Sequence, residues 1–282
     1  MKKIAVLGAG LMGAGIAQVA AAAGYEVILR DLQITLVNDG LKAIGQSLNK
    51  MVNNNQISQA MKEATMARIK GTTDLAQVRN SDLVIEAIVE NIAIKKQIFT
   101  ELDHLCPENT ILATNTSTLS ITEIAFTTRR PDKVLGMHFF FPVASVKIVE
   151  LIKGLGTSDE TIRIARNFAN RINKNSIVVL RDSPGFVVNR ILVAYINEAI
   201  NVLGEGIAGV QEIDKAMKLG AGLQYGPLEM ADIIGLDSLY NMLQTLYNEY
   251  KDSRFRPHII FSNMIRAGYL GKKSGKGFYD YI

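Results

Sequence analysis

The sequence of 282 residues predicts an α/β fold, in which a doubly wound, mostly parallel sheet is followed by an all-α C-terminal domain. Short apolar segments alternate with helical segments over about the first two thirds of the chain, a pattern typical of parallel sheets. The composition changes at Asp182-Ser183-Pro184-Gly185, after which the patterns are almost entirely helical. We therefore expect two domains, residues 1–183 and residues 184–282.

The expected strands of the first domain are short and apolar. They are Lys3–Leu7, Glu26–Arg30, Ile69–Thr73, Asp82–Ala87, Thr110–Thr114, Val134–Phe139, Ile148–Ile152 and Ile177–Leu180. The helices between them are expected at Leu11–Ala23, Leu36–Asn55, Ser58–Ile69, Ile92–Leu105 and Ser158–Ile172. Apolar residues recur at three- and four-residue steps in Leu36–Asn55, which predicts an amphipathic helix. Ser120 and Glu123 form a capping box, which predicts the start of a short helix.

The second domain shows no strand pattern except at the extreme C-terminus. Its helices are predicted at Phe186–Leu203, Gln211–Leu219, Leu228–Tyr250 and Pro257–Ala267. The first of these carries apolar residues on almost every side, which predicts burial on more than one face. Because so small a domain does not readily cover that surface, we expect a homodimer or a higher homo-oligomer.

Composition and charge exclude several classes of protein. The net charge is +4, but no run of five or six like charges occurs and tryptophan is absent, so nucleic-acid binding is not expected. No uninterrupted apolar stretch has membrane-spanning length, so no membrane span is expected. The single cysteine, Cys106, excludes an intramolecular disulfide and fits a cytoplasmic location. We expect it to be a small, partly buried side chain.

The N-terminal segment MKKIAVLGAGLMGAGIAQVAAAAGYEV admits two interpretations. Its charged start and apolar run are found in secretory signal peptides. A signal peptide gains nothing from glycines at fixed spacing, whereas Gly8, Gly10 and Gly13 follow the G-x-G-x-x-G pattern of a dinucleotide-binding turn. Gly8 would form the turn, Gly10 would let the backbone approach a pyrophosphate, and Gly13 would let the helix pack against the strand.

A carboxylate at the end of the second strand favours the dinucleotide site. Asp31 lies 18 residues after Gly13, close to the spacing of about 20 at which an acid hydrogen-bonds the adenosine ribose. Asp31 would repel a 2′-phosphate, which favours NAD over NADP, although Arg30 beside it could accommodate that phosphate. We therefore expect a Rossmann-type, NAD-binding domain whose cofactor is held by Gly8, Ala9, Gly10, Leu11, Met12, Gly13 and Asp31.

Of the three histidines, His138 is the strongest candidate for catalysis. It lies at the end of the sixth expected strand, and ligands of open α/β sheets gather at the carboxyl ends of strands. An imidazole there can accept an alcohol proton near neutral pH, although a structural role is an equal alternative from position alone. His104 and His258 are expected to be surface or capping residues. No histidine or cysteine cluster indicates a metal site.

Six motifs occur in an order that resembles a known family. They are GAGLMGAGIAQVAA, ATNTSTLSI, GMHFFFP with KIVELI, DSPGFVVNRI, GPLEMADIIGLD and KKSGKGFYDY. Together they resemble the short-chain L-3-hydroxyacyl-CoA dehydrogenases, nearest to the bacterial 3-hydroxybutyryl-CoA dehydrogenases, over essentially the whole chain. The resemblance implies NAD-dependent oxidation of a short-chain L-3-hydroxyacyl-CoA, or the reverse reduction of acetoacetyl-CoA as in butyrate-type fermentation.

The resemblance also implies roles for individual residues. His138 would be the catalytic base and Glu150 its partner, since a carboxylate at the second ring nitrogen fixes the tautomer and stabilises the imidazolium. From its position alone, Glu150 could instead be a solvent-facing charge. The other residues implied are Ser117 and Asn189 for the substrate oxygen, Ser47 for CoA, and Glu90, Lys95, Asn115, Ser117 and Lys273 for the cofactor. Without the resemblance, Glu90, Lys95 and Lys273 would be interpreted as solvated surface charges.

The sequence departs from the family pattern at three places. Phe141 stands where the family has an asparagine that contacts the cofactor, and Asn54 stands where relatives tend to carry lysines facing CoA phosphates. Val143-Ala144-Ser145 lacks one family proline. Two alternatives therefore stay open: a related dehydrogenase of a free hydroxy acid or sugar acid, and a non-catalytic dinucleotide-binding protein. Retention of the four catalytic residues argues against the second.

Overall fold

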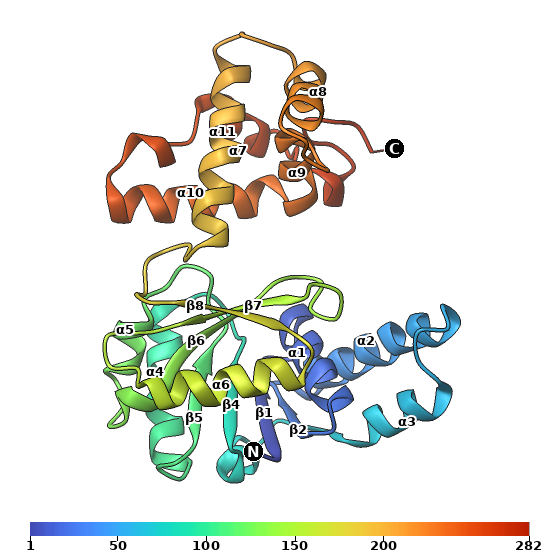
Figure 1. Cartoon of the computed structure of the whole chain (residues 1–282), viewed down its shortest axis with the longest axis vertical. Coiled ribbons are helices and arrows are strands. Elements are labelled where there is room, and N and C mark those ends of the chain that lie inside the picture. The colour runs from blue at the N-terminus through green and yellow to red at the C-terminus, as the bar shows by residue number, and fades with distance from the viewer. Residues whose placement is uncertain (282) are drawn as a thin grey trace. The chain divides into compact units, whose positions relative to one another are not determined.

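The computed structural model describes residues 1–281, which form two compact units (Figure 1). The first unit is Met1–Asp182, and the second begins at Ser183. Each unit encloses its own cluster of buried apolar side chains.

The first unit is built on an eight-stranded sheet with the order β3-β2-β1-β4-β5-β6-β7-β8. The strands from β3 to β6 run parallel, β7 is antiparallel to β6, and β8 is parallel to β7. The predicted doubly wound, mostly parallel sheet is thereby confirmed. The strands are β1 (Lys3–Leu7), β2 (Glu26–Arg30), β3 (Ile69–Thr72), β4 (Leu83–Glu86), β5 (Ile111–Thr114), β6 (Val134–Phe139), β7 (Ile148–Ile152) and β8 (Asn175–Val179).

Helices cover both faces of this sheet. Because side chains alternate along a strand, Ile4 and Val6 of β1 join one apolar cluster while Ala5 and Leu7 join another. The first cluster includes residues of α1, α2 and α6, and the second includes residues of α4 and α5. These helices are α1 (Leu11–Ala22), α2 (Ile34–Asn53), α3 (Gln59–Ala67), α4 (Ile92–Leu105), α5 (Ile121–Ala125) and α6 (Asp159–Arg171).

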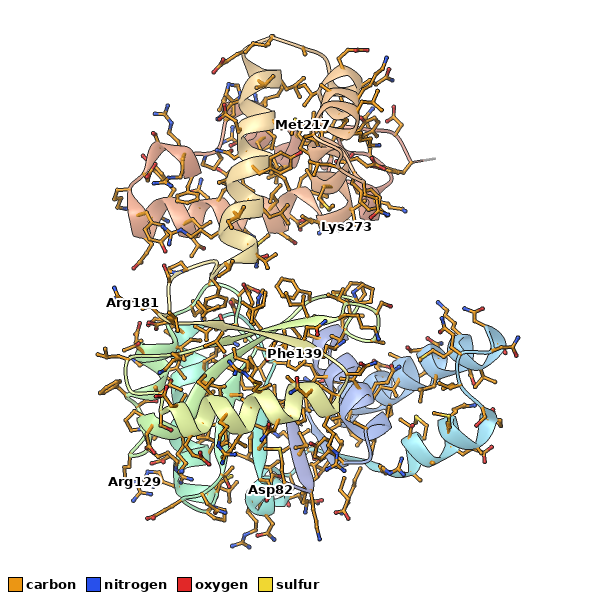
Figure 2. All side chains as sticks on the ribbon, in the orientation of Figure 1. Asp82, Arg129, Phe139, Arg181, Met217 and Lys273 are labelled. Atoms are coloured by element: carbon orange, nitrogen blue, oxygen red, sulfur yellow. The ribbon has the colours of Figure 1, made fainter. Side chains whose placement is uncertain are left out.

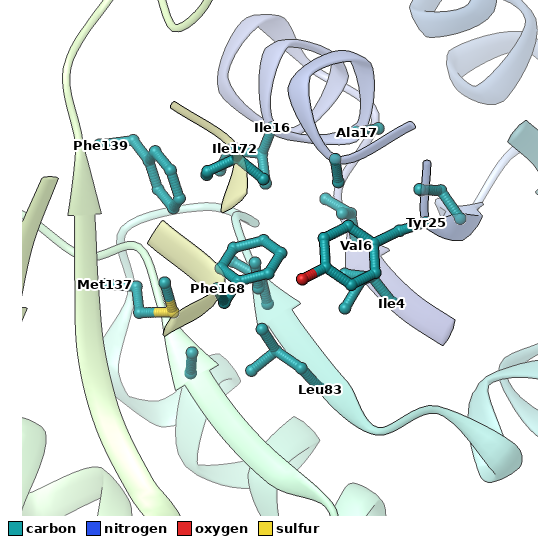
Figure 3. Packing of buried hydrophobic residues seen from close by; sticks show 14 of the residues in the cluster. Ile4, Val6, Ile16, Ala17, Tyr25, Leu83, Met137, Phe139, Phe168 and Ile172 are labelled. Atoms are coloured by element: carbon teal, nitrogen blue, oxygen red, sulfur yellow. The ribbon is translucent and has the colours of Figure 1, made fainter. Parts of the chain in front are cut away.

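Aromatic packing fills the centre of the first cluster. Figure 3 shows the ring of Phe168, from α6, between Met137 of β6 and Tyr25. The ring centroids of Phe168 and Tyr25 lie 5.4 Å apart at 47°, within the range in which tilted aromatic pairs attract. Such burial contributes roughly 25 cal/mol per Å² of apolar surface. It holds the strands, and hence the strand ends that carry the site, in fixed positions.

The second unit is helical and is arranged around α7. Val193, Ile196 and Ile200 of this helix are buried against the helices that follow. The first part of α7 is more exposed, so the predicted burial on several faces holds only for its later turns. The helices are α7 (Val188–Gly204), α8 (Val210–Gly220), α9 (Pro227–Ile234), α10 (Leu236–Tyr250) and α11 (Ile259–Arg266).

The helices predicted at Gln211–Leu219 and Pro257–Ala267 are present with ends shifted by one or two residues, and two other differences in the second unit have a backbone cause. The single helix predicted at Leu228–Tyr250 is wrong, because Gly235 has a φ of 97° and separates α9 from α10. The helix predicted from Phe186 begins at Val188, because Phe186 has a φ of 47°, outside the right-handed helical region. In both cases a backbone conformation with positive φ interrupts an apolar pattern that periodicity alone would continue.

Several local predictions are confirmed. Ser120 caps α5 by accepting a hydrogen bond from the N–H of Glu123, and His258 caps α11 through the N–H of Ile260. Cys106 is buried, and burial raises the pKa of its thiol to about 11. No helix in the described part of the chain is long and apolar enough to cross a membrane.

Candidate active site

The turn between β1 and α1 requires glycine at two positions. A Cβ added to Gly8, whose φ is 95°, would lie 2.4 Å from the carbonyl oxygen of Ala87. A Cβ added to Gly13 would lie 1.8 Å from the carbonyl oxygen of Gly8. Gly10 differs, because no atom lies within 4 Å of its Cβ position. This side of the turn is therefore open to a ligand.

The N-terminus of α1 leaves hydrogen-bond donors for an anion. Gly10 is its N-cap, and no side chain bonds to the helix at this position. The first turn of a helix carries N–H groups without intrahelical partners and a partial positive charge. This end of α1, with Leu11 exposed and Met12 half-buried, therefore fits the pyrophosphate of a dinucleotide.

Asp31 lies beside a cavity next to this turn. Its Oδ2 accepts a hydrogen bond from the N–H of Ala9 at 2.6 Å, and its Oδ1 accepts one from Leu32 at 2.6 Å. The cavity has a volume of about 560 Å³ and lies between the ends of β1 and β4, where the strand order reverses and ligands of doubly wound sheets bind. Its lining includes Gly8, Gly10, Asp31, Leu32, Val89 and Ile94. The residues present therefore fit NAD, and a contact of Asp31 with its ribose stays a prediction.

His138 and Glu150 face each other across β6 and β7. They are direct partners in the antiparallel register, and His138 Nδ1 lies 2.8 Å from Glu150 Oε2. His138 is 4% exposed and Glu150 is fully buried, so the solvent-facing alternative for Glu150 is wrong. A slip of one residue would turn one of the two side chains to the other face of the sheet. The strand register thus creates this pair.

Ser117 completes a chain of three side chains. It follows β5, and its Oγ lies 3.2 Å from His138 Nε2. One imidazole nitrogen therefore faces a carboxylate and the other faces a hydroxyl. An imidazole held in this way can accept a proton at Nε2 while the carboxylate stabilises the resulting positive charge. The structure brings these three predicted residues together within the first unit.

Neighbouring side chains support the end of β6. Asn115 Oδ1 accepts a hydrogen bond from the N–H of Phe139 at 2.9 Å, so this amide is engaged by the strand that carries His138. Phe139 is labelled in Figure 2. The ring of Phe140 approaches the imidazole of His138, with centroids 4.5 Å apart. Phe141 follows and is 62% exposed. An aromatic surface therefore lies immediately after the histidine.

Lys95 is buried, so the interpretation of this lysine as a solvated surface charge, made without the family resemblance, is wrong. It is 1% exposed, and its Nζ lies 2.6 Å from Glu86 Oε1 and 3.4 Å from Glu90 Oε2. Glu90 is partly exposed and accepts hydrogen bonds from the Thr116 hydroxyl and the Ser117 N–H. A direct contact of Glu90 or Lys95 with the cofactor stays a prediction.

Three further predicted residues lie outside this group. Ser47 is half-buried on α2. Asn189 lies in the first turn of α7, and Lys273, labelled in Figure 2, lies in the short 3₁₀ segment Lys272–Ser274. Both belong to the second unit, and Lys273 Nζ forms an ion pair with Asp237 at 2.5 Å. The roles of these three residues stay predictions.

Glu86 is a further buried acid near the site that the sequence did not single out. This residue ends β4, is fully buried, and accepts a hydrogen bond from the Thr114 hydroxyl at 2.7 Å. The signal was present, because Glu86 is an acid within the apolar segment Asp82–Ala87 that the sequence predicts as a strand. In the described residues no group of three or more histidine, cysteine, aspartate or glutamate side chains could hold a metal ion.

The two parts of the chain match models of one protein family. Residues 3–183 match the 3-hydroxyacyl-CoA dehydrogenase, NAD binding domain, and residues 185–281 match the 3-hydroxyacyl-CoA dehydrogenase, C-terminal domain. The chain belongs to the 3-hydroxyacyl-CoA dehydrogenase family. The predicted family, the Rossmann-type domain, the cofactor NAD and the dehydrogenase class are thereby confirmed, and a non-catalytic binding protein is set aside.

Similar members of the 3-hydroxyacyl-CoA dehydrogenase family match along almost their whole length. A 3-hydroxybutyryl-CoA dehydrogenase of Clostridioides difficile is 46% identical over 279 residues, covering 99% of both chains. A probable 3-hydroxybutyryl-CoA dehydrogenase of Bacillus subtilis is 44% identical, covering 100% of this chain and 98% of the relative. The crystal structure of (S)-3-hydroxybutyryl-CoA dehydrogenase from Ralstonia eutropha matches with a TM-score of 0.96 at 43% identity, covering 100% of this chain and 99% of the other.

Proposed function

We propose that this member of the family oxidises L-3-hydroxybutyryl-CoA and similar short-chain substrates with NAD, and catalyses the reverse reduction of acetoacetyl-CoA. The names of its relatives support this acyl length. The observation that carries the proposal is the contact of His138 with Glu150 on one ring nitrogen and with Ser117 on the other. Oxidation of an alcohol needs a base at its hydroxyl proton, and this arrangement supplies one.

The proposed roles follow from the two ring nitrogens. His138 accepts the hydroxyl proton at Nε2, and Glu150 holds the ring at Nδ1 and stabilises the imidazolium. Ser117 and Asn189 bind the oxygen on the reacting carbon and thereby orient the substrate. NAD, when bound, supplies the acceptor for the hydride. In the reduction direction, protonated His138 returns the proton to the oxygen.

We infer that the family contacts to NAD are also made by this chain. The open side of Gly10 and the N-terminus of α1 support a pyrophosphate contact. Asp31 lines the cavity, and its carboxylate would accept hydrogen bonds from the ribose. Glu90, Lys95, Asn115, Ser117 and Lys273 are the further cofactor residues that we propose.

CoA is proposed to lie along α2. Ser47 and Lys50 lie three residues apart on α2, a spacing that places them on one side of the helix, and Asn54 is the C-cap residue of that helix. Lys50 is exposed and offers a positive charge to a phosphate, which Asn54 cannot. This neighbour supports CoA as the acyl carrier despite the departure at Asn54.

We further infer a homodimer or higher homo-oligomer that acts in the cytoplasm. Large apolar side chains of the second unit are exposed, among them Ile191 at 66% and Leu219 at 77%. Burial of such surface against a second copy stabilises an oligomer. The single cysteine supports a reducing compartment. Light scattering at micromolar concentration should show more than one chain per particle, and a monomer would contradict the oligomer.

One assay tests the proposed reaction. Purified protein is given acetoacetyl-CoA with NADH, and in parallel free 3-hydroxybutyrate or a sugar acid with NAD, while NADH absorbance is followed. We expect rapid loss of NADH with acetoacetyl-CoA and little reaction with the free acids. Turnover of a free acid in preference to the CoA substrate would instead establish the alternative substrate class.

A further inference from the structure

Glu86 is a fully buried carboxylate with a hydrogen bond at each oxygen. Its Oε1 accepts from the N–H of Ile88 at 2.7 Å and from Lys95 Nζ at 2.6 Å, and its Oε2 accepts from the Thr114 hydroxyl at 2.7 Å. Thr114 is the last residue of β5, next to β4 in the sheet. These contacts fix the Glu86 carboxylate between two strand ends, and the loop that carries Ser117 begins directly after Thr114.

Lys95 connects Glu86 to a second carboxylate. Its ammonium group is 2.6 Å from Glu86 and 3.4 Å from Glu90. A charged amine that is 1% exposed requires a close counter-charge, because burial of an unpaired charge is very costly. The shorter distance assigns this function to Glu86. The same ammonium group also attracts Glu90 Oε2, but at the longer distance of 3.4 Å.

Glu90 in turn holds the loop after β5. Its other oxygen, Oε1, accepts from the Ser117 N–H at 3.0 Å and from the hydroxyl of buried Thr116. Ser117 Oγ then contacts His138 Nε2. A continuous series of contacts therefore leads from Glu86 through Lys95 and Glu90 to the serine beside the proposed base.

We propose that Glu86 is a positioning residue for Ser117, acting through Lys95 and Glu90. The proposal rests on the proposed function, in which Ser117 binds the substrate oxygen. With a neutral side chain at position 86, the Lys95 ammonium group loses its nearest counter-charge and turns to Glu90. That carboxylate then moves away from the Ser117 N–H, and the serine hydroxyl is no longer held beside His138. Displacement of an orienting group by about 1 Å can cost about 100-fold in rate.

A double-mutant cycle on kcat separates positioning from a merely structural role. Glu86→Gln keeps the size of the side chain and removes its charge, and Glu90→Gln removes the charge that holds Ser117. We expect Glu86→Gln to lower kcat for acetoacetyl-CoA reduction by roughly 10- to 100-fold, with a smaller change in KM for acetoacetyl-CoA. In the Glu90→Gln background the same substitution should cost less than about threefold, because the connection is already broken.

The matched control is Glu123→Gln. Glu123 of α5 pairs at 3.1 Å with Lys96, the residue after Lys95 on α4, but this pair lies at the surface. We expect the control to keep unaltered kcat and KM, since exposed ion pairs contribute little. Tm is measured for every variant, so that loss of folded protein is separated from loss of rate. If Glu86→Gln does not yield folded protein, Glu86→Asp replaces it, because the shorter side chain keeps a buried negative charge but withdraws it from Lys95 Nζ.

The outcomes are distinct. A lower Tm with unaltered kcat would overturn the proposal, since Glu86 would then stabilise the fold alone. Equal losses of kcat in the native and Glu90→Gln backgrounds would also overturn it, because Glu86 would act independently of Glu90. Both tests apply equally to Glu86→Asp. Absence of turnover by the unaltered protein would contradict the proposed function itself, whereas turnover that Glu86→Gln leaves intact contradicts this inference alone.

Discussion

His138 Nδ1 lies 2.8 Å from Glu150 Oε2, although Glu150 follows His138 by 12 positions in the chain and the reversal from β6 to β7 lies between them. The pairing is direct, because the two residues are opposite each other in the antiparallel register. Both side chains are buried, so water does not replace the carboxylate at the ring. This relationship makes the chemistry of the histidine dependent on the glutamate.

Substitutions in this pair should reduce turnover without abolishing cofactor binding. His138→Ala removes the proposed base and should lower kcat by about 10²–10⁴-fold. Glu150→Gln leaves the ring but removes the charge that stabilises the imidazolium, and most turnover should be lost as well. NADH binding, followed by fluorescence titration, should survive in both. Glu160→Gln, an exposed charge on α6, serves as the control, and near-native kcat in Glu150→Gln would disprove the dyad.

The protein should prefer NAD to NADP. Asp31 presents a negative charge where a 2′-phosphate would lie, and the side chain of neighbouring Arg30 is directed to another partner, donating from Nε to the carbonyl of Thr73 at 3.2 Å. kcat/KM for NADH should therefore exceed that for NADPH. Asp31→Ser should narrow the difference between the two kcat/KM values, because it removes the repulsion between the Asp31 carboxylate and the 2′-phosphate of NADPH. Equal values for the two cofactors in the unaltered protein would refute the assignment of Asp31.

Alanine substitutions at Gly10 and Gly13 should have different effects. Gly13→Ala places a methyl group against the Gly8 carbonyl at 1.8 Å, so the turn must distort and Tm should fall. Gly10→Ala meets no protein atom within 4 Å, so Tm should stay within a few degrees of the unaltered protein. Its methyl group should nevertheless weaken NADH binding, because it occupies the side left open for the pyrophosphate.

Tm is measured by thermal unfolding and NADH affinity by titration for both Gly10→Ala and Gly13→Ala. Each variant serves as the control for the other. Tight NADH binding by a folded Gly10→Ala variant would show that the pyrophosphate does not approach this glycine. An unaltered Tm for Gly13→Ala would show that the helix can move away from the strand at little cost.

Phe141→Asn should improve the reaction with acetoacetyl-CoA. Phe141 is 62% exposed beside the site and stands where the family has an asparagine that contacts the cofactor. An amide should restore one hydrogen bond, worth about 1–1.5 kcal/mol. This corresponds to a gain of roughly tenfold in NADH affinity or in kcat.

Steady-state kinetics of the Phe141→Asn variant with acetoacetyl-CoA and with free hydroxy acids provide the measurement. If Phe141 belongs to a pocket shaped for another substrate, the variant should gain nothing with acetoacetyl-CoA and should lose activity on that substrate. A flat or lower rate with acetoacetyl-CoA would therefore argue against a missing cofactor contact.

Local signals in the sequence were sufficient for most of the fold. The alternation of apolar strands and helices predicts the doubly wound sheet, because each element is defined by residues within a few positions of one another. The pattern failed at Gly235, where a positive φ divides one apolar run into two helices. Periodicity reports which face of a helix is apolar, but it does not report the conformation of a single residue.

The sequence by itself determined the family, the NAD-binding turn and the candidate residues, since these depend on residue types at fixed spacing. Only the tertiary structure decided which of the candidates meet. The register of β6 and β7 brings Glu150 to His138, and the neighbouring ends of β4 and β5 enclose Glu86 with Lys95. Residue type alone predicts that Lys95 lies at the surface. In the structure it is buried, and Glu86 at 2.6 Å supplies the counter-charge that this burial needs. Contacts between residues on different strands depend on packing and register, which no local pattern contains.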